Sequence, residues 1–212
     1  MSDEQSRTDH WLDWVATALL ALATVATAWS AYQSRQWTGE QAQGYSRATA
    51  KRIAVNRESA VANRQLQIDV ATFIQWVDAT ARRDAELADF YRARFREEFK
   101  PAFAAWLATK PLTSPNAPRT PFAMPAYRLA TSEEADRLDL AAAADSETAK
   151  AANERANNYM LAVVLFASSV FFAGMSAKLR TRNARITLLA IGGVLFLGTV
   201  VWLATLPVQL TT

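Results

Sequence analysis

Three segments without a charged residue constrain what this chain can fold into. Residues 14–34, 159–177 and 186–206 contain no Asp, Glu, Lys, Arg or His. Each is close in length to the roughly 20 apolar residues that an α-helix needs to cross a bilayer. We therefore predict an all-α membrane protein with three transmembrane helices over these ranges.

The uneven spacing of these segments predicts one domain outside the bilayer. Residues 35–158 separate the first two spans, whereas only residues 178–185 separate the second from the third. Helix-favouring residues dominate the long region, and its prolines concentrate in 111–125, a density that helices and central strands do not tolerate. We expect a helical hairpin or small bundle with a Pro-rich loop, inserted between spans 1 and 2, and short tails at 1–13 and 207–212.

The first uncharged segment is predicted to be a retained span rather than a cleaved signal peptide. A secretory signal begins with a basic region and has a shorter apolar core. Residues 1–13 instead hold four carboxylates and one arginine, a net charge of −3. Aromatic residues of the kind that anchor helices at membrane interfaces flank this segment: Trp11, Trp14, Trp29, Tyr32 and Trp37.

The loop between the second and third spans predicts the orientation in the membrane. It is the one strongly cationic region, through Lys178, Arg180, Arg182 and Arg185. Short basic loops stay cytoplasmic, which places the N-terminus inside and residues 35–158 outside the cytoplasm of a bacterial inner membrane. The cations that follow the first span favour the opposite orientation, but long translocated domains respond less to their charge. These cations are Arg35, Arg47, Lys51 and Arg52.

Small residues in the spans form the first candidate site. Helices in lipid associate through small side chains and hydroxyl groups, so the pattern predicts packing within the chain, a homo-oligomeric seam, or a pore lined by Thr17, Thr24 and Thr27. No ionisable residue lies within the spans to mark an ion pathway. The first-span set is Thr17, Ala21, Thr24, Thr27, Ala28 and Ala31; the later spans contribute Ser169, Ala173, Ala177, Gly192, Gly193 and Gly198.

An aromatic stretch over residues 82–107 predicts a second helix in the inserted domain. Its arginines alternate with carboxylates, so no basic patch for nucleic acid survives. We expect the charged face to be exposed to solvent and to carry ion pairs such as Asp78–Arg82. The apolar face predicts the core of the domain, or a contact for a protein partner through residues 87–107.

Residue types that support catalysis are sparse in this sequence. The chain has no cysteine, which excludes disulfides and thiolate chemistry. Its single histidine, His10, has no partner at metal-ligand spacing, and the six glycines form no phosphate-binding loop. We therefore expect neither enzymatic activity nor a bound metal or cofactor.

The residues at the end of the first span form the second candidate site. We expect either a plain interfacial anchor or a point that couples the domain to the membrane. In both interpretations aromatic rings lie at headgroup level, arginine pairs with phosphates and polar side chains bond between helices. This interfacial belt consists of Trp29, Tyr32, Gln33, Arg35, Trp37 and Glu40.

The segment from Trp29 to Gln41, together with the layout of the spans, resembles a group of uncharacterised small bacterial inner-membrane proteins. These proteins have one N-terminal span, a helical domain and two C-terminal spans. The resemblance implies this topology and no activity.

The sequence as a whole predicts a non-enzymatic membrane protein that self-associates. It would act as an assembly or scaffold that presents a helical domain outside the bilayer. The alternative is an ion channel or transport subunit whose first span lines a pore.

Overall fold

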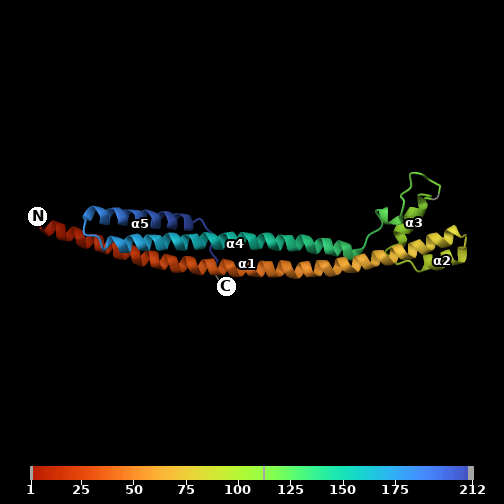
Figure 1. The fold of residues 1–212 in the computed structure, drawn as a ribbon, viewed down its shortest axis with the longest axis horizontal. Coiled ribbons are helices and arrows are strands. Elements are labelled where there is room, and N and C mark those ends of the chain that lie inside the picture. Colours follow the sequence, from red (N-terminus) through yellow and green to blue (C-terminus); the bar gives the residue numbers. More distant parts are fainter. Residues whose placement is uncertain (1, 112, 210–212) are drawn as a thin grey trace. The chain divides into compact units, whose positions relative to one another are not determined.

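The computed structural model describes residues 2–111 and 113–209, with side chains from His10 onwards. Every regular element in these ranges is helical, as Figure 1 shows, so the all-α fold class is confirmed. The elements are α1 (Ser2–Ala81), α2 (Ala85–Ala93), α3 (Lys100–Ala108), the 3₁₀ helix η1 (Pro121–Ala123), α4 (Ala130–Ser176) and α5 (Arg182–Leu203).

Three of these helices, α1, α4 and α5, are long and apolar enough to cross a membrane. The first uncharged segment is the N-terminal part of α1, which continues without a break into the polar region. The second lies at the C-terminal end of α4. The first two spans are therefore parts of longer helices that continue beyond the uncharged segments.

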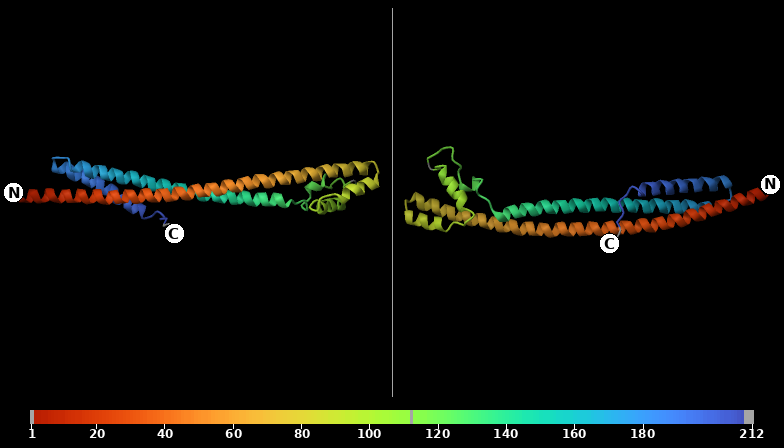
Figure 2. Two further views of the ribbon diagram at one scale, coloured as in Figure 1. Left: turned by 90° about the horizontal axis from the view of Figure 1, so that it is seen from below. Right: turned by 180° about the vertical axis from the view of Figure 1, so that it is seen from behind.

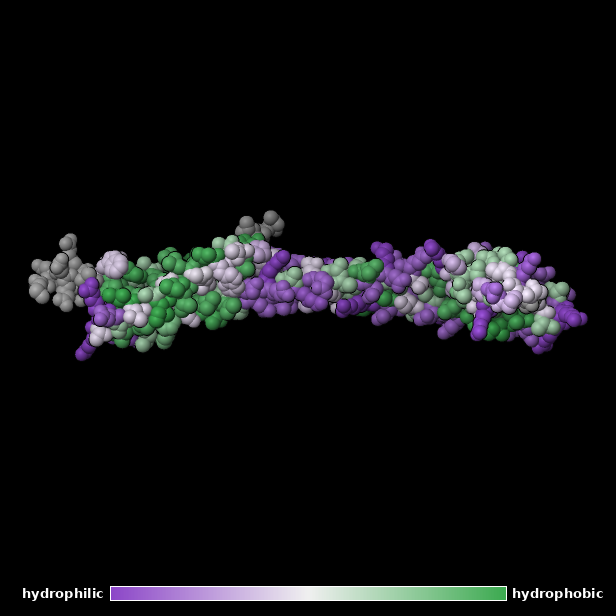
Figure 3. Space-filling view, turned by 90° about the horizontal axis from the view of Figure 1, so that it is seen from above, coloured by the Kyte–Doolittle hydropathy of each residue, from purple (hydrophilic) through white to green (hydrophobic). Residues whose placement is uncertain are grey.

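The chain divides into two compact units. The span unit comprises residues 1–46 and 145–212, and the inserted unit comprises residues 47–144. The surface of the span unit is largely hydrophobic on the face shown in Figure 3, as expected of helices that contact lipid.

Small residues let α1 and α4 approach closely within the span unit. Buried residues of α1 recur every seven positions and are small at all but one of them. At Gly44 the two backbones are so close that an added Cβ atom would lie 2.9 Å from the Ala149 Cβ. Figure 2 shows α4 alongside this part of α1 in both views. The recurring α1 positions are Ala16, Ala23, Ser30, Trp37 and Gly44.

An aromatic cluster forms the core of the inserted unit. Its buried members come from α1, the α2–α3 connection and α3: Phe73, Phe95, Phe99, Phe103 and Trp106. Most of the ring pairs meet edge to face, for example Phe73 and Trp106 with centroids 5.3 Å apart. Such pairs contribute about 0.5–1.5 kcal/mol beyond the burial of apolar area.

The expectation of one helix over residues 82–107 is wrong. The helix ends after Ala93, where Arg94 adopts φ −96° and ψ 1°, and a new helix begins at Lys100 with Pro101 in its first turn. Proline is favoured there because its missing N–H would have no helical partner. The break lets Phe95 and Phe99, which precede α3, pack into the same core as the α3 residue Phe103.

Candidate functional sites

The small-residue stripe of the first span lies mainly on the outside of the span unit. Thr17, Ala21, Thr24 and Ala28 are exposed, whereas Thr27 and Ala31 are half-buried. The packing surface of α1 lies on a different side and includes Leu12, Ala16 and Ala23, which are at most 4% exposed. The interpretation of the stripe as packing within the chain is therefore wrong for the four exposed residues. The other two interpretations stay predictions.

The threonine hydroxyls of this stripe are satisfied within their own helix. Thr17 Oγ1 donates to the Asp13 carbonyl at 2.8 Å, and Thr24 Oγ1 donates to the Leu20 carbonyl at 2.7 Å. Such back-bonding to the preceding turn is common for threonine in helices. Another helix can therefore cover this face without leaving an unsatisfied hydroxyl donor.

The small residues of the other spans divide between the two surfaces. Ser169, Ala173 and Gly192 are buried within the unit. A Cβ atom on Gly192 would lie 3.3 Å from both the Phe172 Cβ and the Ser169 carbonyl oxygen, so the residue permits close packing of α5 on α4. Ala177 and Gly198 are exposed, and Gly193 is half-buried.

Gln33 of the interfacial belt forms hydrogen bonds with the main chain that follows α5. Gln33 is fully buried. Its Nε2 donates to the Gln209 carbonyl, and its Oε1 accepts from the Gln209 amide, both at 3.0 Å. The Tyr159 hydroxyl donates to the Pro207 carbonyl at 3.1 Å. The structure thus uses Gln33 to bind the segment that follows α5, rather than another helix.

Trp37 belongs to the packing of α1 on α4 rather than to the lipid-facing surface. It is 6% exposed and lies in a cluster with Ala152, Ala156 and Tyr159. The Arg155 guanidinium lies 4.5 Å from its ring centroid, a favourable cation–π contact. The expectation that this ring anchors the helix in the headgroups is therefore wrong.

The rest of the belt divides between exposed and half-buried positions. Trp29 and Tyr32 are about two-fifths exposed, with ring centroids 6.0 Å apart. Arg35 is exposed and Glu40 is half-buried. The role of the two exposed rings as interfacial anchors stays a prediction.

The ends of α1 and α5 meet through an ion pair at the opposite end of the spans from the belt. The Arg185 guanidinium pairs with the Asp13 carboxylate. The Arg185 side chain is 12% exposed, so its charge is largely sequestered. The other three cations of the loop, Lys178, Arg180 and Arg182, are exposed.

A buried carboxylate joins three segments of the inserted unit. Asp69 on α1 is fully buried, and its Oδ2 accepts from Arg96 Nη1 at 2.9 Å and from the Tyr127 hydroxyl at 3.0 Å. Arg96 also pairs with Glu98. The other carboxylate oxygen of Asp69, Oδ1, is buried without a hydrogen-bond partner. No feature of the sequence predicted this cluster, because its members are far apart in the chain.

Burial dominates the ionisation of this cluster. It raises the pKa of Asp69 from its ordinary value, although the Tyr127 hydrogen bond and the Arg96 charge act in the opposite direction. Burial and the neighbouring carboxylate also raise the pKa of Tyr127. The tyrosine therefore keeps the proton that it donates to Asp69 throughout the physiological range.

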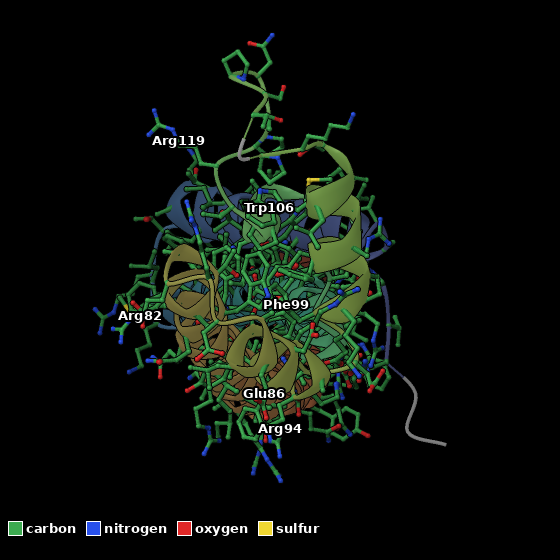
Figure 4. The ribbon with its side chains drawn as sticks, turned by 90° about the vertical axis from the view of Figure 1, so that its right-hand side faces the viewer. Arg82, Glu86, Arg94, Phe99, Trp106 and Arg119 are labelled. Atoms are coloured by element: carbon green, nitrogen blue, oxygen red, sulfur yellow. The ribbon has the colours of Figure 1, made fainter. Side chains whose placement is uncertain are left out.

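An apolar groove of about 670 Å³ lies beside the aromatic core. Trp76 and Val77 of α1, Trp106 of α3 and the Pro-rich loop line it, with Arg119 as its charged member. In Figure 4, Trp106 and Phe99 point into the unit, whereas Arg119 and Arg82 point outward.

The aromatic stretch 87–107 serves the domain core only in part. Its residues from Phe95 onward supply most of the aromatic cluster. Leu87 and Phe90 of α2 are 36% and 46% exposed, and α2 has no buried residue. A contact between this stretch and a protein partner stays a prediction.

Within the described side chains, no group of three His, Asp or Glu residues is arranged to hold a metal ion. The sequence matches no protein-family model, and no curated protein or solved structure shows a significant similarity to it. The geometry of the chain is therefore the basis for the functional proposals below.

Proposed function

We propose that this protein is a non-enzymatic, multi-pass membrane protein that self-associates through α1 and presents the inserted unit as a scaffold outside the bilayer. The observation that carries the proposal is the exposed small-residue face formed by Thr17, Ala21, Thr24 and Ala28. We call it the α1 seam. It supports self-association because the rest of the span unit leaves it uncovered.

The chemistry of the α1 seam suits a second helix. Side chains of this size let two backbones approach closely, and close packing drives helix association where the surrounding lipid is as apolar as the protein. The hydroxyls of Thr17 and Thr24 are already bonded to their own helix. Covering them therefore carries no penalty for an unpaired donor.

The seven-residue recurrence on the other side of α1 supports a coiled-coil arrangement with α4. Sustained repeats of seven residues are typical of helices that wind around each other. Small residues at Ala16, Ala23 and Gly44 suit a close-packed version of this arrangement. Each protomer would then enter the assembly as a preformed helix pair, with the α1 seam on its outside.

An ion channel or transport subunit is the alternative function. It is favoured by one observation, the exposure of Thr17 and Thr24 on the same side of α1. In that arrangement the α1 seam would face a water-filled axis. Replacement of Thr24 by Trp would then block ion flux through liposomes that contain the protein, and absence of flux in the parent chain would end this alternative.

Single-cysteine crosslinking tests self-association, because the chain has no native cysteine. We expect Ala21→Cys and Ala28→Cys to give disulfide-linked dimers on mild oxidation in membranes. Ala23→Cys is the buried control, since Ala23 is 0% exposed. Leu22→Cys is the exposed control on another side of the helix, since Leu22 is 58% exposed. Equal crosslinking at Ala21 and Leu22, or none at Ala21, would contradict the α1 seam.

We further propose that the inserted unit is extracytoplasmic and that the membrane is a bacterial inner membrane. Three exposed cations in the α4–α5 loop support a cytoplasmic loop. Topology reporters fused at residues 115 and 181 test this orientation. A reporter at residue 181 that is active only outside the cytoplasm would overturn it.

A further inference from the structure

We propose that the connection between α4 and α5 is a binding surface for anionic phospholipid headgroups, formed by Lys178, Arg180 and Arg182. We call these residues the cationic triad. The proposal rests on the three helices spanning a bilayer, but it does not require self-association. Phospholipid headgroups and free phosphate would both offer phosphate oxygens to these cations. We assign the bound phosphate group to lipid rather than to a free anion.

The connection is tight and turns its cations outward. α4 ends at Ser176 and α5 begins at Arg182. The Lys178 amide donates to the Met175 carbonyl at 3.1 Å, and the Leu179 amide donates to the Ser176 carbonyl at 3.3 Å. Leu179 is half-buried, whereas the three cations around it are exposed. The turn and the first residue of α5 thus expose three positive charges around one half-buried apolar side chain.

The positive charge of the cationic triad is not neutralised by the described part of the chain. The nearby Asp13 carboxylate pairs with Arg185, the fourth cation of the region. Among the described side chains, none of the acidic groups lies within ion-pair distance of Lys178, Arg180 or Arg182. Lysine and arginine bind phosphate oxygens through charge-assisted hydrogen bonds, so the triad is complementary to phosphate.

Two exposed tryptophans place the cationic triad at headgroup depth. Trp11 and Trp14 are 63% and 75% exposed. They flank Asp13, whose ion pair with Arg185 ties this end of α1 to the start of α5. Tryptophan side chains concentrate at the interface between the hydrocarbon core and water. The same level of the membrane contains the lipid phosphates, so the triad and the phosphates lie at one depth.

The form of the surface favours a lipid over a free phosphate. Two of the cations are exposed on the turn and the third at the first residue of α5, and they do not converge in a pocket. A small soluble anion would gain little there against bulk water, because exposed ion pairs are weak. Lipid headgroups are held at this depth by the bilayer, and anionic lipids attract basic segments next to spans.

Lipid selectivity tests this proposal in the full-length chain. The protein is reconstituted in nanodiscs of phosphatidylcholine with one-fifth phosphatidylglycerol, then extracted in mild detergent, and the retained lipids are quantified by mass spectrometry. The test variant is Lys178→Gln, Arg180→Gln, Arg182→Gln. Its matched control is Lys110→Gln, Arg119→Gln, Arg128→Gln, which removes three cations of the inserted unit. Because each nanodisc is open on both faces, a change of orientation in cells does not affect the result.

We expect the parent chain and the control to retain phosphatidylglycerol selectively. In the test variant, the enrichment of phosphatidylglycerol over phosphatidylcholine should fall roughly ten-fold. A charge-preserving variant, Lys178→Arg, Arg180→Lys, Arg182→Lys, should keep it, which separates loss of charge from loss of folding. Equal enrichment in the parent chain and the test variant would overturn the proposal. Displacement of the lipid by millimolar inorganic phosphate would also overturn it, in favour of a free-anion site.

The test is independent of self-association. Disulfide crosslinking through Ala21→Cys, made in the background of the test variant, should be unchanged. Absence of crosslinking through Ala21→Cys in the otherwise unchanged chain, with lipid enrichment retained, would contradict the α1 seam and leave the cationic triad intact.

Discussion

At the scale of single residues, Asp69 shows how opposing electrostatic effects are resolved in this chain. Arg96 and Tyr127 both favour its charged form, yet burial outweighs them and raises its pKa. The carboxylate ties α1 to the α2–α3 connection and to the residues before α4 through two hydrogen bonds. The cluster thus holds these three segments of the inserted unit together, although burying a charged group is unfavourable.

The ionisation of Asp69 predicts a pH dependence of stability. The folded chain holds the Asp69 proton more tightly than the unfolded chain, which releases it near the ordinary value of 3.8. The contribution to stability is therefore full below that pH and is lost as the pH rises through the raised pKa of the folded state.

We expect Asp69→Asn to remove this contribution, because the amide does not ionise. Thermal unfolding of the full chain in nanodiscs, followed at the aromatic core by near-ultraviolet circular dichroism, measures it. On going from pH 7.5 to pH 4.5, the parent chain should gain stability relative to the variant, because the folded chain takes up the Asp69 proton at a higher pH than the unfolded chain. Parallel changes in both chains would show that Asp69 does not titrate as described.

The belt residue Gln33 shows what sequence reasoning identifies at this scale and what it misses. The sequence predicts that the Gln33 amide forms hydrogen bonds between helices, because an unpaired amide in apolar surroundings is costly. The sequence does not indicate the partner, since the Gln209 main chain follows a helix at the far end of the chain. Partners brought together by tertiary packing leave no local signal.

At the scale of helices, the long elements were predictable and the short ones were not. Uncharged segments and helix-favouring residues predicted the helical content of α1 and α4, and no Pro interrupts either helix. The break between α2 and α3 was missed, because an aromatic periodicity continues through it. Its cause is tertiary, since Phe95 and Phe99 turn into a core shared with Phe73.

The two glycines of α1 near the belt make a matched test of its packing. Gly44→Ala adds a methyl group 2.9 Å from the Ala149 Cβ, with the Ala149 backbone at 3.3 Å, so rigid atoms must move. We expect a loss of about 1–3 kcal/mol from overpacking, which exceeds the gain in helix propensity. Gly39→Ala meets nothing within 4 Å and should stabilise the chain by about 0.5–1 kcal/mol.

The measurement is the free energy of unfolding of each variant in the same detergent, or the change in its thermal midpoint. Opposite signs for the two substitutions support close packing of α1 on α4 at Gly44. A gain in stability at both positions would mean that the two helices do not approach closely there.

At the scale of the whole molecule, the proposed scaffold follows from which side of α1 is covered. The sequence predicted a stripe of small residues but not its direction, because small residues suit contacts within a chain and between chains equally. The burial of individual residues distinguishes contacts within the chain from faces open to contacts between chains. Ala16 and Ala23 face the chain's own helices, whereas Ala21 and Ala28 face away from them.

The mass of the purified protein in detergent tests self-association most directly. Sedimentation equilibrium under density-matched conditions gives the mass of the protein without the detergent. We predict a multiple of the 23.4 kDa chain, and a shift toward the single-chain mass when Ala21 and Ala28 on the α1 seam are both replaced by Phe. A parent protein of 23.4 kDa at every concentration would contradict the account.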